Sequence, residues 1–300
     1  MNCRIIDIHT HIYPVALARR AMEVTRHEND DFKKLPIREN LLARMQEAGV
    51  DISVNLPVVS KPQNQGEVNR FAKESARKNI IPFGGLHPDC ANVIEELEKL
   101  KDMEMAGIKF HPPFQKVQSG RSKYEEMWRK INEWDFPVLI HMGTARIRAP
   151  YDLYPSGIRK IFKICPRISP IIMAHMGSFC MMKNPNENLE NLPENVFIDT
   201  AMSAELEEAG EFEEIVRKFG TKRVLYGCDF PYGSQKAAIA RIKDSSFSDS
   251  EKEDMLWRNA AKILKQWENC RRILSCKASE KLQLSENNAG YLSQGQEMEQ

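Results

Sequence analysis

Short runs of apolar, mostly β-branched residues alternate with longer amphipathic segments along almost the whole chain. Each short run has the length of a strand, and most are followed by apolar residues at helical spacing. We predict eight strands, at residues 3–11, 51–58, 80–87, 107–111, 137–142, 170–176, 196–201 and 223–230. We predict helices over residues 41–48, 68–76, 93–103, 127–134, 158–165, 212–219, around 238–242, and over 256–267. Gly49 and Gly220 directly follow two of these helices, where glycine commonly ends a helix.

Eight strands separated by helices favour parallel strand–helix–strand units, and eight is the number that closes a barrel. The alternative, an open doubly wound sheet, would carry a glycine-rich phosphate loop after an early strand, and the sequence has none. We therefore expect the α/β class and a (β/α)8 TIM barrel over residues 1–268. Two long connections, 14–37 and 177–193, would then lie at the carboxyl-terminal face, where substrate loops sit. Residues 275–300 are rich in Ser, Glu, Gln and Asn, so we expect residues 269–300 to form a flexible tail that is dispensable after about Lys277.

The composition excludes some classes of function. The 43 basic and 42 acidic residues nearly cancel, so no strong field points to nucleic acid or an anionic membrane. No apolar run reaches the roughly 18 residues of a membrane span. Seven scattered cysteines without Cys-x-x-Cys spacing suggest reduced thiols, and a strand that begins at once leaves no room for a signal peptide. We expect a cytoplasmic protein that binds a small-molecule substrate, and homo-oligomer formation stays open.

Histidines gather at the carboxyl ends of the predicted strands. His9 and His11 lie two apart on the first strand, so their side chains share a face and form a natural chelating pair. Such a pair by itself is weak evidence for a metal site, because histidines on strands often only form hydrogen bonds within the core. The same placement recurs at four further strand ends, in His111, His141, His175 and Asp229. Neutral imidazoles and a carboxylate that converge from separate elements favour a metal site.

Two histidines lack this support. His27 lies in a long predicted loop and is typical of a surface residue. His87 ends the third strand but is followed by Pro88 and Asp89, which is as consistent with a structural role.

Five segments, in this order, resemble the amidohydrolase superfamily: DIHTH, IKFHP, LIHMG, MAHMG and GCDFP. They are most similar to its amidohydrolase-related branch, which includes metal-dependent decarboxylases similar to aminocarboxymuconate semialdehyde decarboxylase. The resemblance covers roughly residues 5–267, and NAAKIL near its end looks like the segment that closes these barrels.

The resemblance implies that His9, His11, His141 and Asp229 hold a divalent metal ion, with Zn²⁺ expected. A metal-activated water would attack the substrate, and Asp229 would act as general base. His175 would be a proton donor, an electrophile, or a ligand of a second metal. Two structural readings stay open: His175 as a hydrogen-bonding residue of the barrel wall, and Asp229 as a helix N-cap.

Two further aspartates lie on the predicted strands. Asp7 shares the parity of His9, so we expect it to point inward and accept a hydrogen bond that fixes an imidazole tautomer. A buried carboxylate paired with another cation is the alternative. Asp199, at the end of the seventh strand, is a candidate substrate-binding or supporting residue.

Lys109 shares the parity of His111, so both should face the barrel interior. In binuclear members of the superfamily a lysine on this strand is carbamylated and bridges two metals. A free ammonium would instead bind a substrate carboxylate and repel a second cation. We expect one metal ion, with two if Lys109 is carbamylated. Arg146 and Arg148 would clamp an anionic substrate or simply be exposed.

These residues predict a metal-dependent hydrolase that acts on a small amide, lactone or ester. The alternative enzyme is a nonoxidative decarboxylase of a small unsaturated or aromatic carboxylic acid with the same ligands. A third hypothesis, from a different functional class, is a barrel that binds a ligand without catalysing a reaction. The complete ligand set disfavours it, because a binding module has no need for an open metal position.

Overall fold

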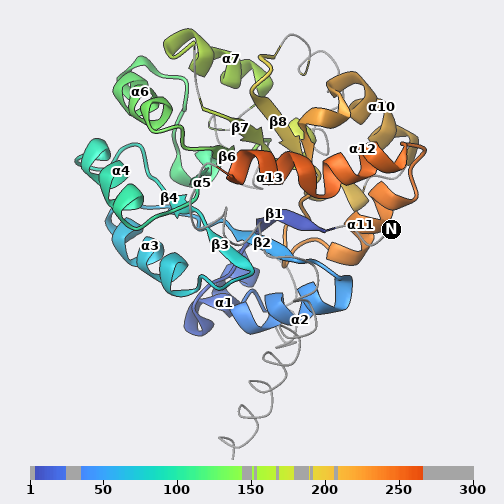
Figure 1. Ribbon diagram of the computed structural model, residues 1–300. Coiled ribbons are helices and arrows are strands. Elements are labelled where there is room, and N and C mark those ends of the chain that lie inside the picture. Colours follow the sequence, from blue (N-terminus) through green and yellow to red (C-terminus); the bar gives the residue numbers. More distant parts are fainter. Residues whose placement is uncertain are drawn as a thin grey trace, which may run out of the picture.

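The computed structural model describes residues 4–24, 35–143, 151, 154–166, 169–178, 189, 192–205 and 209–265. Its strands lie in the middle of the molecule, and helices surround them (Figure 1). The strands are β1 (Ile6–Thr10), β2 (Ile52–Asn55), β3 (Ile80–Pro82), β4 (Gly84–Gly85), β5 (Ile108–Phe110), β6 (Val138–Ile140), β7 (Ile171–Met173), β8 (Val196–Asp199) and β9 (Val224–Leu225).

The strands form a closed parallel barrel. β1, β2 and β3 pair in that order, and β4 to β9 pair consecutively, all in parallel. β3 and β4 are two parts of one predicted strand, of which the first pairs with β2 and the second with β5. The last seam joins β1 to the segment after β9: the Ile8 amide donates to the Tyr226 carbonyl (2.9 Å), and the Asp229 amide donates to the His9 carbonyl (2.9 Å). The predicted (β/α)8 barrel is therefore confirmed.

The helices follow the predicted alternation, with additions in three places: within residues 14–37, at residues 112–115 and at residues 249–253. They are α1 (Val15–Val24), α2 (Arg38–Ala48), α3 (Gln65–Glu74), α4 (Val93–Asp102), α5 (Pro112–Gln115), α6 (Glu125–Glu133), α7 (Pro155–Ile164), α10 (Ala209–Phe219), α11 (Gln235–Lys243), α12 (Asp249–Glu253) and α13 (Asn259–Leu264). α1 lies in the stretch 14–37 that we predicted as a long connection, and α12 was not predicted. Gly49 and Gly220 both have positive φ, 73° and 94°, as expected after a helix. No helix in the described ranges combines the length and the apolar character needed to cross a bilayer.

The apolar core has two layers. One lies between the strands and the outer helices, and its members include Leu41 and Met45 of α2. The other fills the barrel interior, where Ile6 and Leu225 pack with Ala261 and Leu264 of α13. α13 crosses the strands in Figure 1 and packs against residues near the starts of β1 and β9, so it covers the amino-terminal end of the barrel. The proposed tail, residues 269–300, lies outside the described residues.

Candidate metal centre

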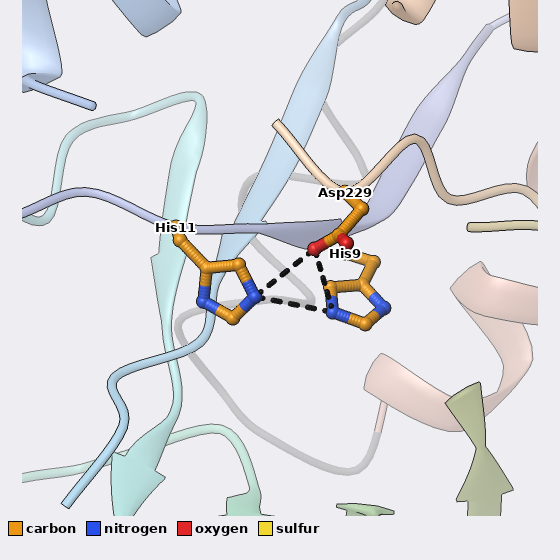
Figure 2. A group of neighbouring side chains, drawn as sticks. All are labelled: His9, His11 and Asp229. Carbon is orange, nitrogen blue, oxygen red and sulfur yellow. Dashed lines mark hydrogen bonds and ion pairs between the residues drawn. The ribbon is translucent and has the colours of Figure 1, made fainter. Parts of the chain in front are cut away.

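Three side chains meet at the carboxyl-terminal end of the barrel (Figure 2). The Nε2 atoms of His9 and His11 lie 3.2 Å apart. Oδ1 of Asp229 lies 3.3 Å from the first nitrogen and 3.2 Å from the second. All three residues are buried. Within the described part of the chain, this is the only group of at least three His, Cys, Asp or Glu side chains whose donor atoms lie close enough to hold one ion.

The hydrogen-bond partner of Nδ1, the second nitrogen of each imidazole, determines the tautomer of the ring. His9 Nδ1 lies 2.7 Å from Oδ2 of Asp199, and His11 Nδ1 lies 2.7 Å from the carbonyl oxygen of Leu56. Because a carboxylate and a carbonyl only accept, both Nδ1 atoms donate, and in its neutral form each ring keeps its lone pair on Nε2. Burial, with the charge of Lys109, lowers the pKa of His9 well below its usual value, so this ring is neutral at pH 7.

The donor set fits a divalent cation. The two Nε2 lone pairs and the Asp229 oxygen form a nearly equilateral triangle of acceptors with sides of 3.2–3.3 Å. Tetrahedral bonds of roughly 2.0–2.1 Å would separate ligand atoms by about 3.3–3.4 Å. With neutral rings, a cation placed among three acceptors this close would be attracted by all of them. Two imidazoles and a carboxylate are ligands that Zn²⁺ and related ions accept.

A bulge in β1 brings both histidines into the barrel. Ile6 and Asp7 pair with Ile52 and Ser53, but the next partners are Thr10 and Asn55, so β1 holds one extra residue. An extra residue changes which face the following side chains occupy. The alternation predicted for an even strand therefore fails between Asp7 and His9.

The bulge changes the role of Asp7. Its neighbours Ile6 and Ile8 face the interior, and Asp7 accepts from Gln235 Nε2 at 2.9 Å and from the Cys228 amide at 3.1 Å. It contacts the backbone amide of His9 rather than an imidazole. Asp199 takes the position that we expected for Asp7. Burial raises the pKa of Asp7 to about 6.

Gly227 allows β1 and the segment after β9 to approach each other. A Cβ atom at this position would lie 2.9 Å from Cβ of His9 and 3.5 Å from Cβ of Asp199. The first distance is too short for a Cβ atom, whereas the second is an ordinary contact, so glycine is needed here to leave room for His9. The GCDFP segment thus supplies the space beside the candidate ligands as well as one of them.

Asp229 occupies a left-handed position with φ 68°. The N-cap of the following helix α11 is Ser234, whose side chain accepts from the Ala237 amide, so Asp229 does not cap that helix. Burial acts to raise the pKa of Asp229, but the neighbouring imidazoles of His9 and His11 outweigh it. The pKa therefore lies well below its usual range, and the carboxylate is ionised at neutral pH.

His175 lies on a left-handed turn rather than on the strand that we predicted. β7 ends at Met173, and the four residues from His175 to Ser178 all have positive φ. Such a run is costly for residues other than glycine and is typical of functional sites. The turn places the His175 ring 5.1 Å from that of His9, between centroids. Burial lowers the pKa of His175, so its ring is neutral at pH 7.

His141 contacts His175, and His111 in turn stacks on His141. His141 Nδ1 is 3.0 Å from His175 Nε2, and the His141 ring stacks on that of His111 with centroids 4.0 Å apart. His141 does not belong to the three-residue group, so its role as a fourth ligand stays a prediction. Two buried atoms, His141 Nε2 and His175 Nδ1, have no hydrogen-bond partner among the described residues.

Lys109 is the cationic residue of the site. Its side chain is fully buried, and Nζ lies 3.3 Å from His9 Nε2. Burial lowers the pKa of Lys109 from 10.5 to about 8, against the opposing charges of Asp229 and Asp199. The amine is therefore mostly protonated at pH 7. Arg146, Arg148 and His27 lie outside the described residues.

Sequence reasoning underrated some neighbours of the site. Asp199 was recognisable by its strand-end position, but its contact with His9 joins residues 190 positions apart. Tyr232, whose ring centroid lies 6.2 Å from that of His11, was not singled out. Its place three residues after Asp229 was the available signal. His87 accepts from the Asp89 amide (3.2 Å), as its structural interpretation expects.

A parallel eight-stranded barrel with imidazoles and a carboxylate at the carboxyl ends of its strands is the architecture of a metal-dependent TIM-barrel enzyme. The sequence profile of the Amidohydrolase family matches residues 6–266, and the chain belongs to this family.

Solved structures with the same fold include both decarboxylases and hydrolases. A dihydroxybenzoic acid decarboxylase from Polaromonas, with bound manganese and 2-nitroresorcinol, is 16% identical, with a TM-score of 0.69 over 88% of this chain and 97% of that one. A 5-carboxyvanillate decarboxylase from Novosphingobium aromaticivorans, also with manganese, is 15% identical, with a TM-score of 0.68 over 88% and 97%. A candidate 2-pyrone-4,6-dicarboxylic acid hydrolase from Pseudomonas putida is 15% identical, with a TM-score of 0.64 over 89% and 99%. No curated protein sequence matches the chain.

Proposed function

We propose that this chain is a metal-dependent hydrolase of a small amide, lactone or ester. The proposal is carried by the triangle of acceptor atoms from His9, His11 and Asp229. We propose Zn²⁺ as the ion, with Mn²⁺ next, since imidazole and carboxylate ligands suit both. A divalent ion in this position supplies a Lewis acid for the substrate carbonyl and lowers the pKa of a water molecule. His141, with its unpartnered Nε2, is the proposed fourth ligand.

Asp229 and His175 would move protons on either side of the carbonyl. Asp229 is ionised at neutral pH, and one of its oxygens lies between the two histidines. Its other oxygen would accept the proton of the attacking water. His175 is buried and neutral, and its unpartnered Nδ1 would donate a hydrogen bond to the developing oxyanion in the tautomer that carries a proton there.

Lys109 would bind an anionic group of the substrate. Its ammonium is buried beside His9 and would repel a second cation, so we propose one ion per chain. The carboxylate of a substrate would place a negative charge beside this buried cation and pair with it. Arg146 is a further candidate for the same anion.

Metal analysis with one matched pair of variants tests this proposal. The purified full chain, incubated with zinc or manganese and then dialysed, should retain about one ion. It should hydrolyse at least one member of a panel of amides, lactones and esters. Asp229→Asn should abolish turnover, because an amide cannot accept the proton. Asp89→Asn, at a partly exposed carboxylate that pairs with Lys123 outside the proposed centre, should keep activity near wild type. A chain that retains no ion would refute the proposed centre.

Decarboxylation is the second candidate, and Lys109 is the observation that favours it. A decarboxylase needs a cationic contact for the carboxylate that it removes, and the buried ammonium beside His9 provides one. Decarboxylases of similar fold are consistent with this alternative.

The two reactions differ in the fate of a proton. Release of CO₂ from an aromatic or unsaturated acid in D₂O should leave deuterium on the carbon that lost CO₂. CO₂ release without hydrolysis across the amide, lactone and ester panel would make decarboxylation the function. Hydrolysis without CO₂ release would exclude it for the compounds tried.

A further inference from the structure

The two carboxylate oxygens of Asp199 contact two different parts of the site. Oδ2 lies 2.7 Å from Nδ1 of His9. Oδ1 accepts from the backbone amide of His175 at 2.9 Å and from that of Ala201 at 3.0 Å. The side chain is completely buried at the end of β8. One carboxylate therefore links a proposed metal ligand on β1 to the turn that follows β7.

We infer that Asp199 is the positioning residue of this centre: it holds His9 in the tautomer that binds metal and anchors the left-handed turn that carries His175. The inference rests on the proposed metal centre. It assigns to Asp199 no contact with substrate or with the ion.

Asp199 allows His9 only one neutral tautomer. His9 can bind an ion through Nε2 only if that atom has no proton, so its remaining proton must lie on Nδ1. Asp199 Oδ2 accepts this proton's hydrogen bond and excludes the opposite tautomer, in which two lone pairs would face each other at 2.7 Å.

The turn depends on the other oxygen. His175 and Met176 have φ of 57° and 53°, values that residues with a Cβ rarely adopt. Such a conformation persists only where neighbouring contacts hold it. The hydrogen bond from the His175 amide to Oδ1 is the contact made by the first residue of the turn.

The position requires an ionised carboxylate rather than its isosteric amide. All the groups that face Asp199 in these contacts are donors: His9 Nδ1–H and the amides of His175 and Ala201. An asparagine has one oxygen and one amino group. If the amino group faces His9, the ring must move its proton to Nε2, which blocks the metal position. If the amino group faces the backbone amides, the anchor of the turn is lost.

The first test reads the His9 tautomer directly in the metal-free full chain. Histidine ring nitrogens labelled with ¹⁵N distinguish a protonated from an unprotonated nitrogen by NMR, and His9→Gln identifies the signals of this ring. We expect a proton on Nδ1 and none on Nε2 near pH 8. A proton on Nε2 and none on Nδ1 would overturn the inference. This result does not depend on whether the wild type retains metal, so it separates the inference from the proposed function.

The second test compares Asp199→Asn with Asp199→Ala, by zinc competition against a chromophoric chelator. Asp199→Asn should lose about 10–100-fold in zinc affinity, the usual cost of removing a partner behind a metal-bound histidine. The loss should be at least as large as in Asp199→Ala, because alanine does not impose the wrong tautomer. Asp89→Asn should bind zinc like the wild type.

A purely structural role predicts the opposite order. The isosteric asparagine would then be the milder substitution and would bind zinc nearly as well as the wild type, which would overturn the inference. Circular dichroism of each variant checks that it is folded. If Asp199→Asn does not fold, the ¹⁵N measurement on the wild type decides alone.

Discussion

Different interactions stabilise the two ends of the barrel. At the amino-terminal end, α13 packs Ala261 and Leu264 against apolar residues such as Ile6 and Leu225. At the carboxyl-terminal end, the interior holds His9, Lys109 and other buried polar groups, joined by charge and hydrogen bonds. The same strands therefore support an end built for stability and an end built for chemistry, as is general for this fold.

The polar end also departs from regular backbone geometry. β1 carries a bulge just before its histidines, and residues 175–178 and Asp229 have positive φ. Burying polar groups and holding these conformations both cost free energy. We therefore expect substitutions at this end to change metal binding strongly with little loss of stability, and substitutions at the amino-terminal end to lower stability with little change in metal binding.

The largest expected effect is that of His11→Ala. This substitution removes one of the three acceptor atoms, so zinc affinity should fall by more than about 100-fold. The loss of a direct ligand should exceed the roughly 10–100-fold loss that is usual when a residue supporting a ligand is removed. The lost hydrogen bond to the Leu56 carbonyl should cost the metal-free protein at most about 2 kcal/mol. Chelator competition and urea unfolding measure the two quantities. Unchanged zinc affinity would remove His11 from the centre.

The reverse pattern is expected for Leu264→Ala in α13. Leu264 is completely buried, and truncation of such a side chain costs about 2–5 kcal/mol in lost burial and cavity formation. Urea unfolding of the metal-free chain should show this loss, while zinc affinity stays within about twofold of the wild type. A fall in zinc affinity as large as in His11→Ala would show that the two ends are not independent.

Lys109→Met tests how much the buried charge at the carboxyl-terminal end lowers the stability of the protein. The pKa of Lys109 falls from 10.5 to about 8 on burial, so between these pH values the unfolded chain binds more protons and stability rises with pH. Below about pH 8 the full cost of the buried charge is present, on the order of 3 kcal/mol. Lys109→Met should therefore stabilise the metal-free protein at pH 7 and flatten the pH dependence between 8 and 10.5. Urea unfolding of the wild type and the variant at pH 7 and across pH 8–10.5 measures both effects. A variant that is less stable than the wild type at pH 7 would contradict the prediction.

The smallest expected effect is that of Ser248→Ala. Ser248 begins α12 with a capping box, in which its side chain accepts from the Glu251 amide and its own amide donates to the Glu251 carboxylate. Loss of the cap should cost about 1 kcal/mol and leave zinc affinity unchanged. Ser248→Asp, which retains an acceptor, should recover most of the loss. If alanine and aspartate destabilise equally, the cap contributes nothing.

The sequence by itself determined the architecture and the kind of site. Strands and helices depend on local burial patterns, so apolar periodicity sufficed to predict eight parallel strands. Strand ends meet at one face of a barrel, so His9, His11 and Asp229 were recognisable as a group before any contact was known. Helix stops at Gly49 and Gly220 followed from glycine's access to positive φ.

Only the tertiary structure decided which carboxylate lies behind His9. A bulge is defined by the register of a strand against its partner, so no pattern within residues 6–10 reveals that β1 holds one residue more than β2. The left-handed turn at His175 is likewise held by Asp199, which lies 24 residues further along the chain. Periodicity predicted a strand there because it reports burial alone. The anchor that permits positive φ comes from another strand, and the pairing of β7 with β8 brings it into place.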